Sequence, residues 1–247
     1  MSAPTYASVN GLQMYYEVHG SGPPLVLLHG GALTAGLNFG PMIPALAESH
    51  RVIAVEMQGH GHTADIEREM TLENFADDIV TLLGQLGIEH ADLFGYSLGG
   101  CVSLAIATRH PELVRKLVLA STPTRRQDFA LDGQLDADRM PTAADGQEWE
   151  AEYRRVAPHP DRFGDLLARA GAMVGAIADS SPDELRAIRA PTLILIGDRD
   201  FISIDQAART RDLIPDAQLA ILPGATHVDV ARRPNQVLAM VAPFLDA

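Results

Sequence analysis

Ser97 has the local surroundings that a serine nucleophile requires. It lies in the pattern GYSLG at 95–99, directly after the apolar run 91–94 and before the helical pattern 100–109. In that context the two glycines allow a sharp strand-to-helix turn that exposes Oγ above the carboxyl edge of a sheet. The five-residue pattern alone also describes a glycine-rich turn with a helix-capping serine, so the flanking elements carry the prediction.

A serine hydroxyl is a poor nucleophile until a base takes its proton, and the base should stand on a loop at the end of a later strand. Of the nine histidines, His227 fits best. It follows the apolar run 217–222 across the turn PGAT and precedes the C-terminal helical pattern. The chain order serine, acid, histidine places the base there.

The imidazole needs a carboxylate that fixes its tautomer and stabilises its charged form. The apolar run 192–196 leads into GDRD at 197–200, where both Asp198 and Asp200 are candidates. We favour Asp200, because the first residue after the glycine more often turns away in a loop of this type. Asp198 stays as the alternative, and Asp205 is interpreted as a helix-start residue.

Acyl transfer also needs two N–H donors aimed at the oxygen that gains charge. The sequence HGGA at 29–32 ends an early strand, so Gly31 is expected to supply one backbone N–H and Leu98 the other. His29 is expected to brace this loop.

Two weaker patterns favour structural roles. The segment QGHGHT at 58–63, with Glu56 and Asp65 nearby, offers few suitable ligands for a metal ion. A structural turn beside the site is the better interpretation. Cys101, the single cysteine, is expected to be a buried small residue rather than a second nucleophile. No metal and no cofactor are expected.

The order of elements predicts an α/β fold with a mostly parallel, doubly wound sheet. Asn10 and Gly11 separate two strand-like segments, as in an N-terminal antiparallel hairpin. The short apolar runs 24–28 and 51–55 are typical of parallel strands covered on both faces. Later runs alternate with helical patterns, of which the segment after Thr71 is the clearest.

The region 122–189 interrupts this alternation and predicts a helical cap inserted into a core of 1–121 and 190–247. It has no strand-like run, a helical pattern at 146–156 that holds the single tryptophan, and a capping signal SPDE at 181–184. A cap of this kind would line the substrate pocket. The candidate substrate-binding residues are Met140, Trp149, Tyr153, Phe163 and Met173.

The composition excludes several classes of protein. A formal net charge of −13 makes nucleic acid and anionic lipid surfaces improbable partners. The N-terminal residues lack the charged start and apolar run of a secretory signal, and no apolar stretch is long enough for a membrane span. We therefore expect a cytoplasmic protein whose partner is a small-molecule ester or lactone, with the oligomeric state left open.

Taken together, the motifs at 29–31, 59–61, 95–100, 197–200 and 224–227 resemble the α/β-hydrolase superfamily in order and spacing. The resemblance covers nearly the whole chain outside the insertion, and is greatest to small, capped bacterial esterases, lactonases, perhydrolases and carbon–carbon bond hydrolases. It implies triad roles for Ser97, Asp200 and His227.

Several residues distinguish the chain from particular groups of the superfamily. Gly31 stands where many perhydrolases have an aromatic residue, and the loop lacks the third glycine and proline typical of carbon–carbon hydrolases. The serine at 97 disfavours dehalogenases and epoxide hydrolases, which use aspartate there. Gln58 replaces an arginine common in its loop.

The sequence thus predicts a serine hydrolase that cleaves carboxylic esters or lactones of small to medium size through an acyl-enzyme. The alternatives are a carbon–carbon bond hydrolase or a perhydrolase on the same fold. From another class, a ligand-binding receptor with little turnover is the rival, although a binding role would not require all three triad residues.

Overall fold

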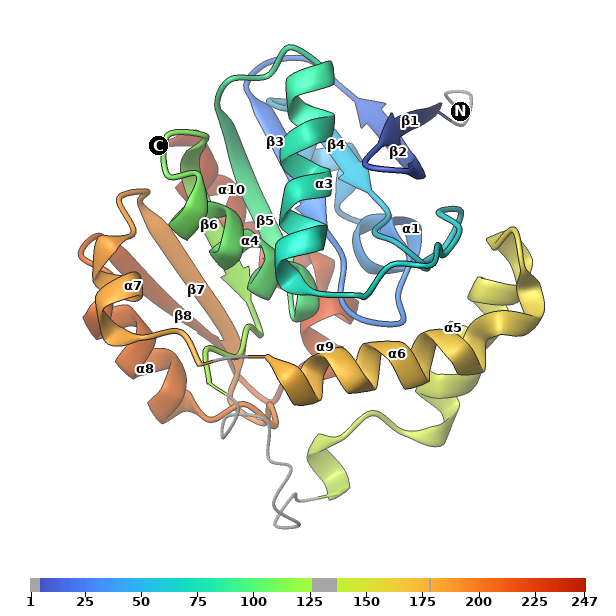
Figure 1. Cartoon of the computed structure of the whole chain (residues 1–247). Helices are drawn as coiled ribbons and strands as arrows, with labels where there is room; N and C mark the ends of the chain where they lie inside the picture. The colour runs from blue at the N-terminus through green and yellow to red at the C-terminus, as the bar shows by residue number, and fades with distance from the viewer. Residues whose placement is uncertain (1–4, 126–136, 178) are drawn as a thin grey trace.

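The computed structural model describes residues 5–125, 137–177 and 179–247. Its centre is an eight-stranded sheet in the order β1-β2-β4-β3-β5-β6-β7-β8. β2 pairs antiparallel with both β1 and β4, and the remaining neighbours pair in parallel. Helices cover the sheet on both faces (Figure 1). The predicted N-terminal hairpin and mostly parallel, doubly wound sheet are confirmed.

The strands are β1 (Thr5–Val9), β2 (Leu12–His19), β3 (Pro24–Leu28), β4 (Arg51–Val55), β5 (Ala91–Tyr96), β6 (Val114–Ala120), β7 (Thr192–Gly197) and β8 (Ala217–Leu222). The core helices are α1 (Ala35–Phe39), α2 (Ile43–Leu46), α3 (Leu72–Gln85), α4 (Leu98–Arg109), α8 (Ile204–Leu213), α9 (His227–Arg232) and α10 (Pro234–Asp246).

The central strands are apolar on both faces because each face packs against helices. Along β3, Val26 and Leu28 join the apolar cluster that contains Phe75 of α3. Leu25 and Leu27 point the other way, into the cluster that contains Phe39 of α1. This alternation explains why the run 24–28 has no polar positions.

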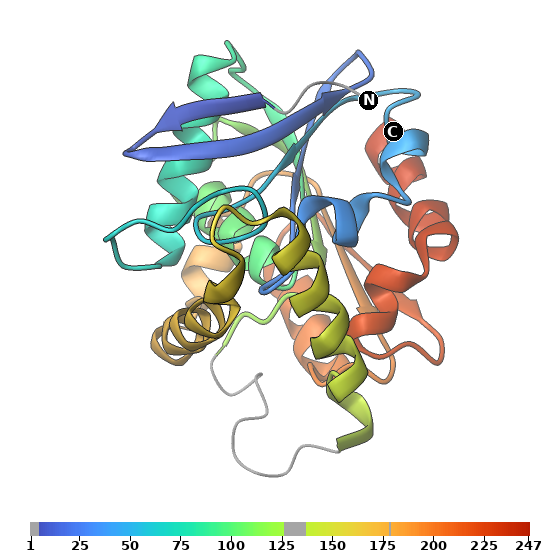
Figure 2. The same cartoon turned by 90° about the vertical axis from the view of Figure 1, so that its right-hand side faces the viewer.

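The segment between β6 and β7 holds η2 (Ala137–Arg139), α5 (Ala143–Val156), η3 (Pro160–Arg162), α6 (Phe163–Ala176) and α7 (Pro182–Ala187). α5 begins before the predicted start at 146, because Thr142 caps it and forms a capping box with Asp145. The predicted capping box at Ser181 is confirmed, and it starts α7. α5 and α6 lie across one end of the sheet (Figures 1 and 2), whereas α7 contacts α4 and α8.

Parallel strands bring the ends of distant segments to the same edge of the sheet. β3 ends before His29, β5 before Ser97, and β7 before Asp198, while His227 follows the turn after β8. The edge that α5 and α6 cover therefore collects the chemistry-bearing residues of four segments. In the part of the chain that the structure describes, no helix is long and apolar enough to cross a membrane.

The turn from β5 into α4 forces Ser97 into a rare backbone conformation, with φ of 51° and ψ of −114°. A non-glycine residue at positive φ is strained, and such strain persists only where the surroundings hold it. Here the helix start packs tightly against β3: a Cβ added to Gly99 would lie 1.9 Å from the carbonyl oxygen of Leu28. Glycine at 99 thus lets α4 approach the sheet.

We expect Gly99→Ala to lower the free energy of unfolding by at least about 2 kcal/mol, because the added methyl would overlap backbone that cannot move aside. Gly84→Ala is the matched control, since a Cβ at Gly84 in α3 meets nothing within 4 Å. That change should be neutral or stabilising by up to about 1 kcal/mol. Urea unfolding of both variants measures the difference, and equal stabilities would contradict the packing described.

Candidate active site

Three side chains form a hydrogen-bonded line at the carboxyl edge of the sheet. Ser97 Oγ lies 3.0 Å from His227 Nε2, and His227 Nδ1 lies 2.9 Å from Asp200 Oδ1. A carboxylate only accepts, so Nδ1 carries the proton and donates it to Asp200. Nε2 is then free of a proton and accepts from the Ser97 hydroxyl. The sequence-predicted serine, histidine and favoured aspartate are brought together.

The surroundings of Asp200 favour its ionised form. The residue is 1% exposed, and its Oδ2 accepts from the Ser121 hydroxyl at 2.6 Å while its Oδ1 also accepts from the Ile202 N–H at 3.0 Å. Burial alone would raise the pKa of this carboxyl. The facing imidazole of His227 and the hydrogen bonds outweigh burial, so the pKa lies below its ordinary value.

Asp198, the alternative acid, is directed elsewhere. Its Oδ1 accepts from the Ala225 N–H at 3.3 Å, in the turn that precedes His227. Asp198 therefore supports the loop that carries the histidine, and the contact with the imidazole belongs to Asp200.

His227 is held from two sides by residues that the sequence motifs did not single out. The Tyr96 hydroxyl donates to the His227 carbonyl at 2.8 Å, and the Phe201 ring stacks on the imidazole with centroids 4.1 Å apart. Ser121, which bonds Asp200, is the third such residue. Each lies directly beside a recognisable residue or element: Tyr96 precedes Ser97, Phe201 follows Asp200, and Ser121 follows β6. The position of each residue next to a recognised motif or strand was therefore the one signal in the sequence that could have found it.

The loop after β3 is braced by a buried histidine. His29 Nε2 accepts from the Met57 N–H at 3.1 Å, so its Nδ1 donates to the Gly30 carbonyl at 2.8 Å. Burial lowers the pKa of His29 to about 3, which keeps the ring neutral. This matches the bracing role expected for His29. Gly31 and Leu98, the predicted oxyanion donors, both border the cavity in front of Ser97.

A cavity of about 220 Å³ opens onto Ser97 and His227. Most of its lining is apolar, and includes Leu33, Leu98, Pro141, Val174, Ile177 and Phe201. Among the described residues that line it there is no aspartate, glutamate, lysine or arginine. Of the five predicted substrate-binding residues, Met140, Trp149 and Met173 line this cavity.

Tyr153 and Phe163 do not line the cavity. Both are buried, and their rings pack together with centroids 5.4 Å apart, joining α5 to the start of α6. Helical spacing does not reveal which side of a two-helix segment faces the core, so the sequence could not separate these two from the lining residues.

Arginines tie α5 and α6 to the rest of the molecule. Arg232, at the end of α9, bonds Asp145 and Glu148 of α5. Arg169 of α6 bonds Asp65 and the Arg68 carbonyl in the loop before α3. The ion pairs of Arg232 therefore link α9, the helix that begins at His227, directly to α5.

The loop 56–63 is a structural turn. Glu56 accepts from both the backbone N–H and the Nδ1 of His62, and this bond raises the pKa of His62. His60 is buried, and its Nδ1 donates to the Gln58 carbonyl. In the described ranges no group of three histidine, cysteine, aspartate or glutamate side chains could hold a metal ion.

The side chain of Gln58 is held by Arg68. Its Oε1 accepts from the Arg68 guanidinium, which also pairs with Asp78.

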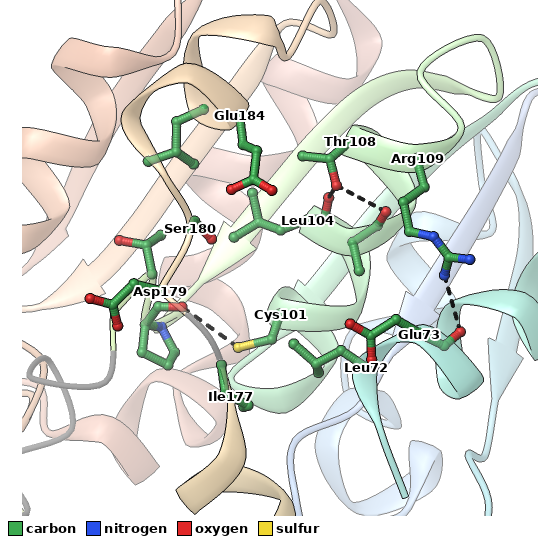
Figure 3. A pocket seen from close by; sticks show the side chains of 14 residues that line it. Leu72, Glu73, Cys101, Leu104, Thr108, Arg109, Ile177, Asp179, Ser180 and Glu184 are labelled. Atoms are coloured by element: carbon green, nitrogen blue, oxygen red, sulfur yellow. Dashed lines mark hydrogen bonds between the residues drawn. The ribbon is translucent and has the colours of Figure 1, made fainter.

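Cys101 is buried in the first turn of α4 and lines both the Ser97 cavity and a separate pocket of about 190 Å³. Its Sγ donates to the Pro123 carbonyl at 3.6 Å, the contact drawn at Cys101 in Figure 3. Burial raises the pKa of the thiol to about 12, so it remains protonated and unreactive at neutral pH. Cys101 acts as a small packing residue, as the sequence suggests.

A serine, imidazole and carboxylate in this order can carry out acyl transfer. The imidazole can take the hydroxyl proton as oxygen attacks a carbonyl carbon, and can return it to the leaving group. The carboxylate stabilises the imidazolium in between.

The chain matches the alpha/beta hydrolase fold family over residues 23–234, and it belongs to that family. It is 28% identical, over an alignment 269 positions long, to a pimeloyl-acyl-carrier-protein methyl ester esterase of Nitrosospira multiformis, covering 94% of this chain and 98% of that protein. It is 30% identical over 270 residues to a 2-hydroxy-6-oxo-2,4-heptadienoate hydrolase of Pseudomonas putida, covering 96% and 94%. An enol-lactonase of Burkholderia xenovorans superposes with a TM-score of 0.79 at 26% identity, covering 98% and 100%.

Labelling with a fluorophosphonate probe tests the hydrogen-bonded line. We expect the native protein to be labelled and Ser97→Ala to remain unlabelled. Asp200→Asn should slow labelling on the order of a thousandfold, because asparagine holds the wrong imidazole tautomer. Asp198→Asn is the matched control and should stay within about tenfold of the native rate. A larger loss at 198 than at 200 would show that the acid has been misassigned.

Proposed function

We propose that this member of the family is a serine hydrolase of carboxylic esters. Ser97 attacks the acyl carbon, His227 takes its proton and passes it to the leaving alcohol, and water then releases the acid from the acyl-enzyme. Asp200 orients His227 and stabilises its charged form. The observation that carries the proposal is the continuous line of two hydrogen bonds from Ser97 to Asp200.

The backbone N–H groups of Gly31 and Leu98 are proposed to bind the oxyanion of the tetrahedral intermediate. Their support is position: both residues border the cavity beside Ser97, and His29 fixes the loop that carries Gly31. Donors held by a rigid loop stabilise charge without having to reorganise during the reaction.

The cavity favours a small, uncharged ester. Its volume of about 220 Å³ lies below the roughly 300–1,000 Å³ of pockets that hold drug-sized ligands. Its described lining is chiefly apolar and holds no cation, which favours a substrate without a carboxylate, because a buried charge without a partner costs several kcal/mol. The net charge of −13 adds a field that repels anions.

The second candidate is hydrolysis of a carbon–carbon bond. A hydroxy-oxo-heptadienoate contains no ester, so the relative of that name must cleave a different bond from the esterase relative, and the two are similarly identical to this chain. Sequence similarity therefore does not choose between them. The apolar cavity favours the ester, because a dienoate carries a carboxylate.

We further propose that 122–189 acts as a cap on a core formed by 1–121 and 190–247. The contribution of α5 and α6 residues to the Ser97 cavity supports this role. α7, which contacts α4 and α8, joins the end of the cap to the core.

A matched pair of substrates tests the proposed specificity. We expect p-nitrophenyl butyrate to be hydrolysed with a kcat/KM at least about a hundredfold above that of mono-p-nitrophenyl succinate, a similar acyl chain that ends in a carboxylate. An unpaired buried charge costs about 3–5 kcal/mol, which sets this ratio. Ser97→Ala is the control for background hydrolysis.

The same panel should include a 6-oxo-dienoate. Turnover of the dienoate without turnover of either ester would replace the proposal by a carbon–carbon hydrolase. Absence of both turnover and fluorophosphonate labelling would favour a ligand-binding receptor.

A further inference from the structure

A second cavity, of about 310 Å³, lies next to the Ser97 cavity. Leu33, Tyr96 and Trp149 line both cavities, so their side chains form the wall between them. Beyond the wall the lining is chiefly apolar, with Leu37, Pro41, Val228, Ala231 and Pro234. Its charged members, Glu148 and Arg232, pair with each other.

The three residues of the wall differ in how they are held. Tyr96 is buried in β5 and its hydroxyl is bonded to the His227 carbonyl, while Leu33 is buried in the loop after β3. Trp149 comes from α5, is only partly buried, and packs against the apolar clusters on both faces of the sheet. Of the three, only Trp149 comes from α5 rather than from the sheet or from the loop that carries Gly31.

We propose that Trp149 sets the chain length of the ester by closing the Ser97 cavity off from the second cavity. The two spaces have volumes of about 220 and 310 Å³, so joining them by removal of the indole should more than double the room for an alkyl chain that starts at the ester group. This inference rests on the proposed ester hydrolysis. The chain concerned is an alkyl chain, in the acyl or the alcohol part of the substrate.

Burial of methylenes sets the size of the effect. Each methylene that moves from water into an apolar space raises kcat/KM by about fourfold where the space exists. In the native protein this gain should stop when the chain reaches Trp149. In a variant without the indole it should continue over several more carbons.

The experiment measures kcat/KM for p-nitrophenyl esters from acetate to decanoate, and for butyrates of alcohols from methyl to decyl. We expect Trp149→Ala to raise the decanoate-to-butyrate ratio, or its alcohol counterpart, by at least about tenfold over the native protein. The series that responds identifies which part of the ester faces Trp149. Trp149→Leu should give a smaller shift in the same direction. It replaces the alanine variant in the experiment if Trp149→Ala is too unstable to assay.

A control variant blocks the second cavity from its far side. Leu37 lines that cavity and not the Ser97 cavity. Adding Leu37→Trp to Trp149→Ala should fill the new space and reverse most of the gain, whereas Leu37→Trp alone should leave the native chain-length profile unchanged. A gain that survives Leu37→Trp would mean that long chains go elsewhere, and the proposal would be wrong.

Alkyl fluorophosphonates separate this inference from the proposed function. The ratio of labelling rates for decyl and ethyl probes reports the room beside Ser97 even if no ester is turned over. An unchanged ratio and unchanged chain-length profiles in folded Trp149→Ala and Trp149→Leu would overturn the inference. Absence of ester hydrolysis with an increased probe ratio would overturn the proposed function alone.

Discussion

The hydrogen bond between Asp200 and His227 is the contact on which the rest of the site depends. It decides which imidazole nitrogen carries the proton, and therefore whether Nε2 can accept from Ser97. A buried carboxylate can play this part only if it stays ionised, and the bonds from Ser121 and Ile202 help to keep it so. Tyr96 and Phe201 then fix the ring against its partners.

The fold supplies this contact by a simple geometric rule. Parallel strands end at the same edge, so loops that are more than a hundred residues apart in sequence meet there. The elbow at Ser97 adds strain that close packing of Gly99 on β3 holds in place. α5 and α6 cover the edge, and Arg232 links α5 to the helix that begins with His227.

The strands, the elbow and the three aligned residues could be predicted from sequence, because apolar runs and glycine-rich turns are local signals. Asp200 and Asp198 could be ranked but not separated, since both follow the same strand and only the path of the loop decides. The residues that line the Ser97 cavity were harder to predict from the sequence than the acid. Trp149 and Tyr153 lie one helical turn apart on α5, yet one borders the cavity and the other packs against Phe163. Residues four positions apart lie on the same face of a helix, so helical periodicity cannot show which of the two borders the cavity.

The most direct test of nucleophilic catalysis by Ser97 is to trap the proposed acyl-enzyme. Rapid mixing with p-nitrophenyl butyrate, acid quench and peptide mass spectrometry should reveal a butyryl group on the peptide that contains Ser97. It should accompany a burst of p-nitrophenolate that does not exceed one equivalent per protein molecule, and Ser97→Ala should show neither signal. Steady hydrolysis that persists in Ser97→Ala, or a butyryl group on another residue, would contradict the proposed role of Ser97 as the nucleophile.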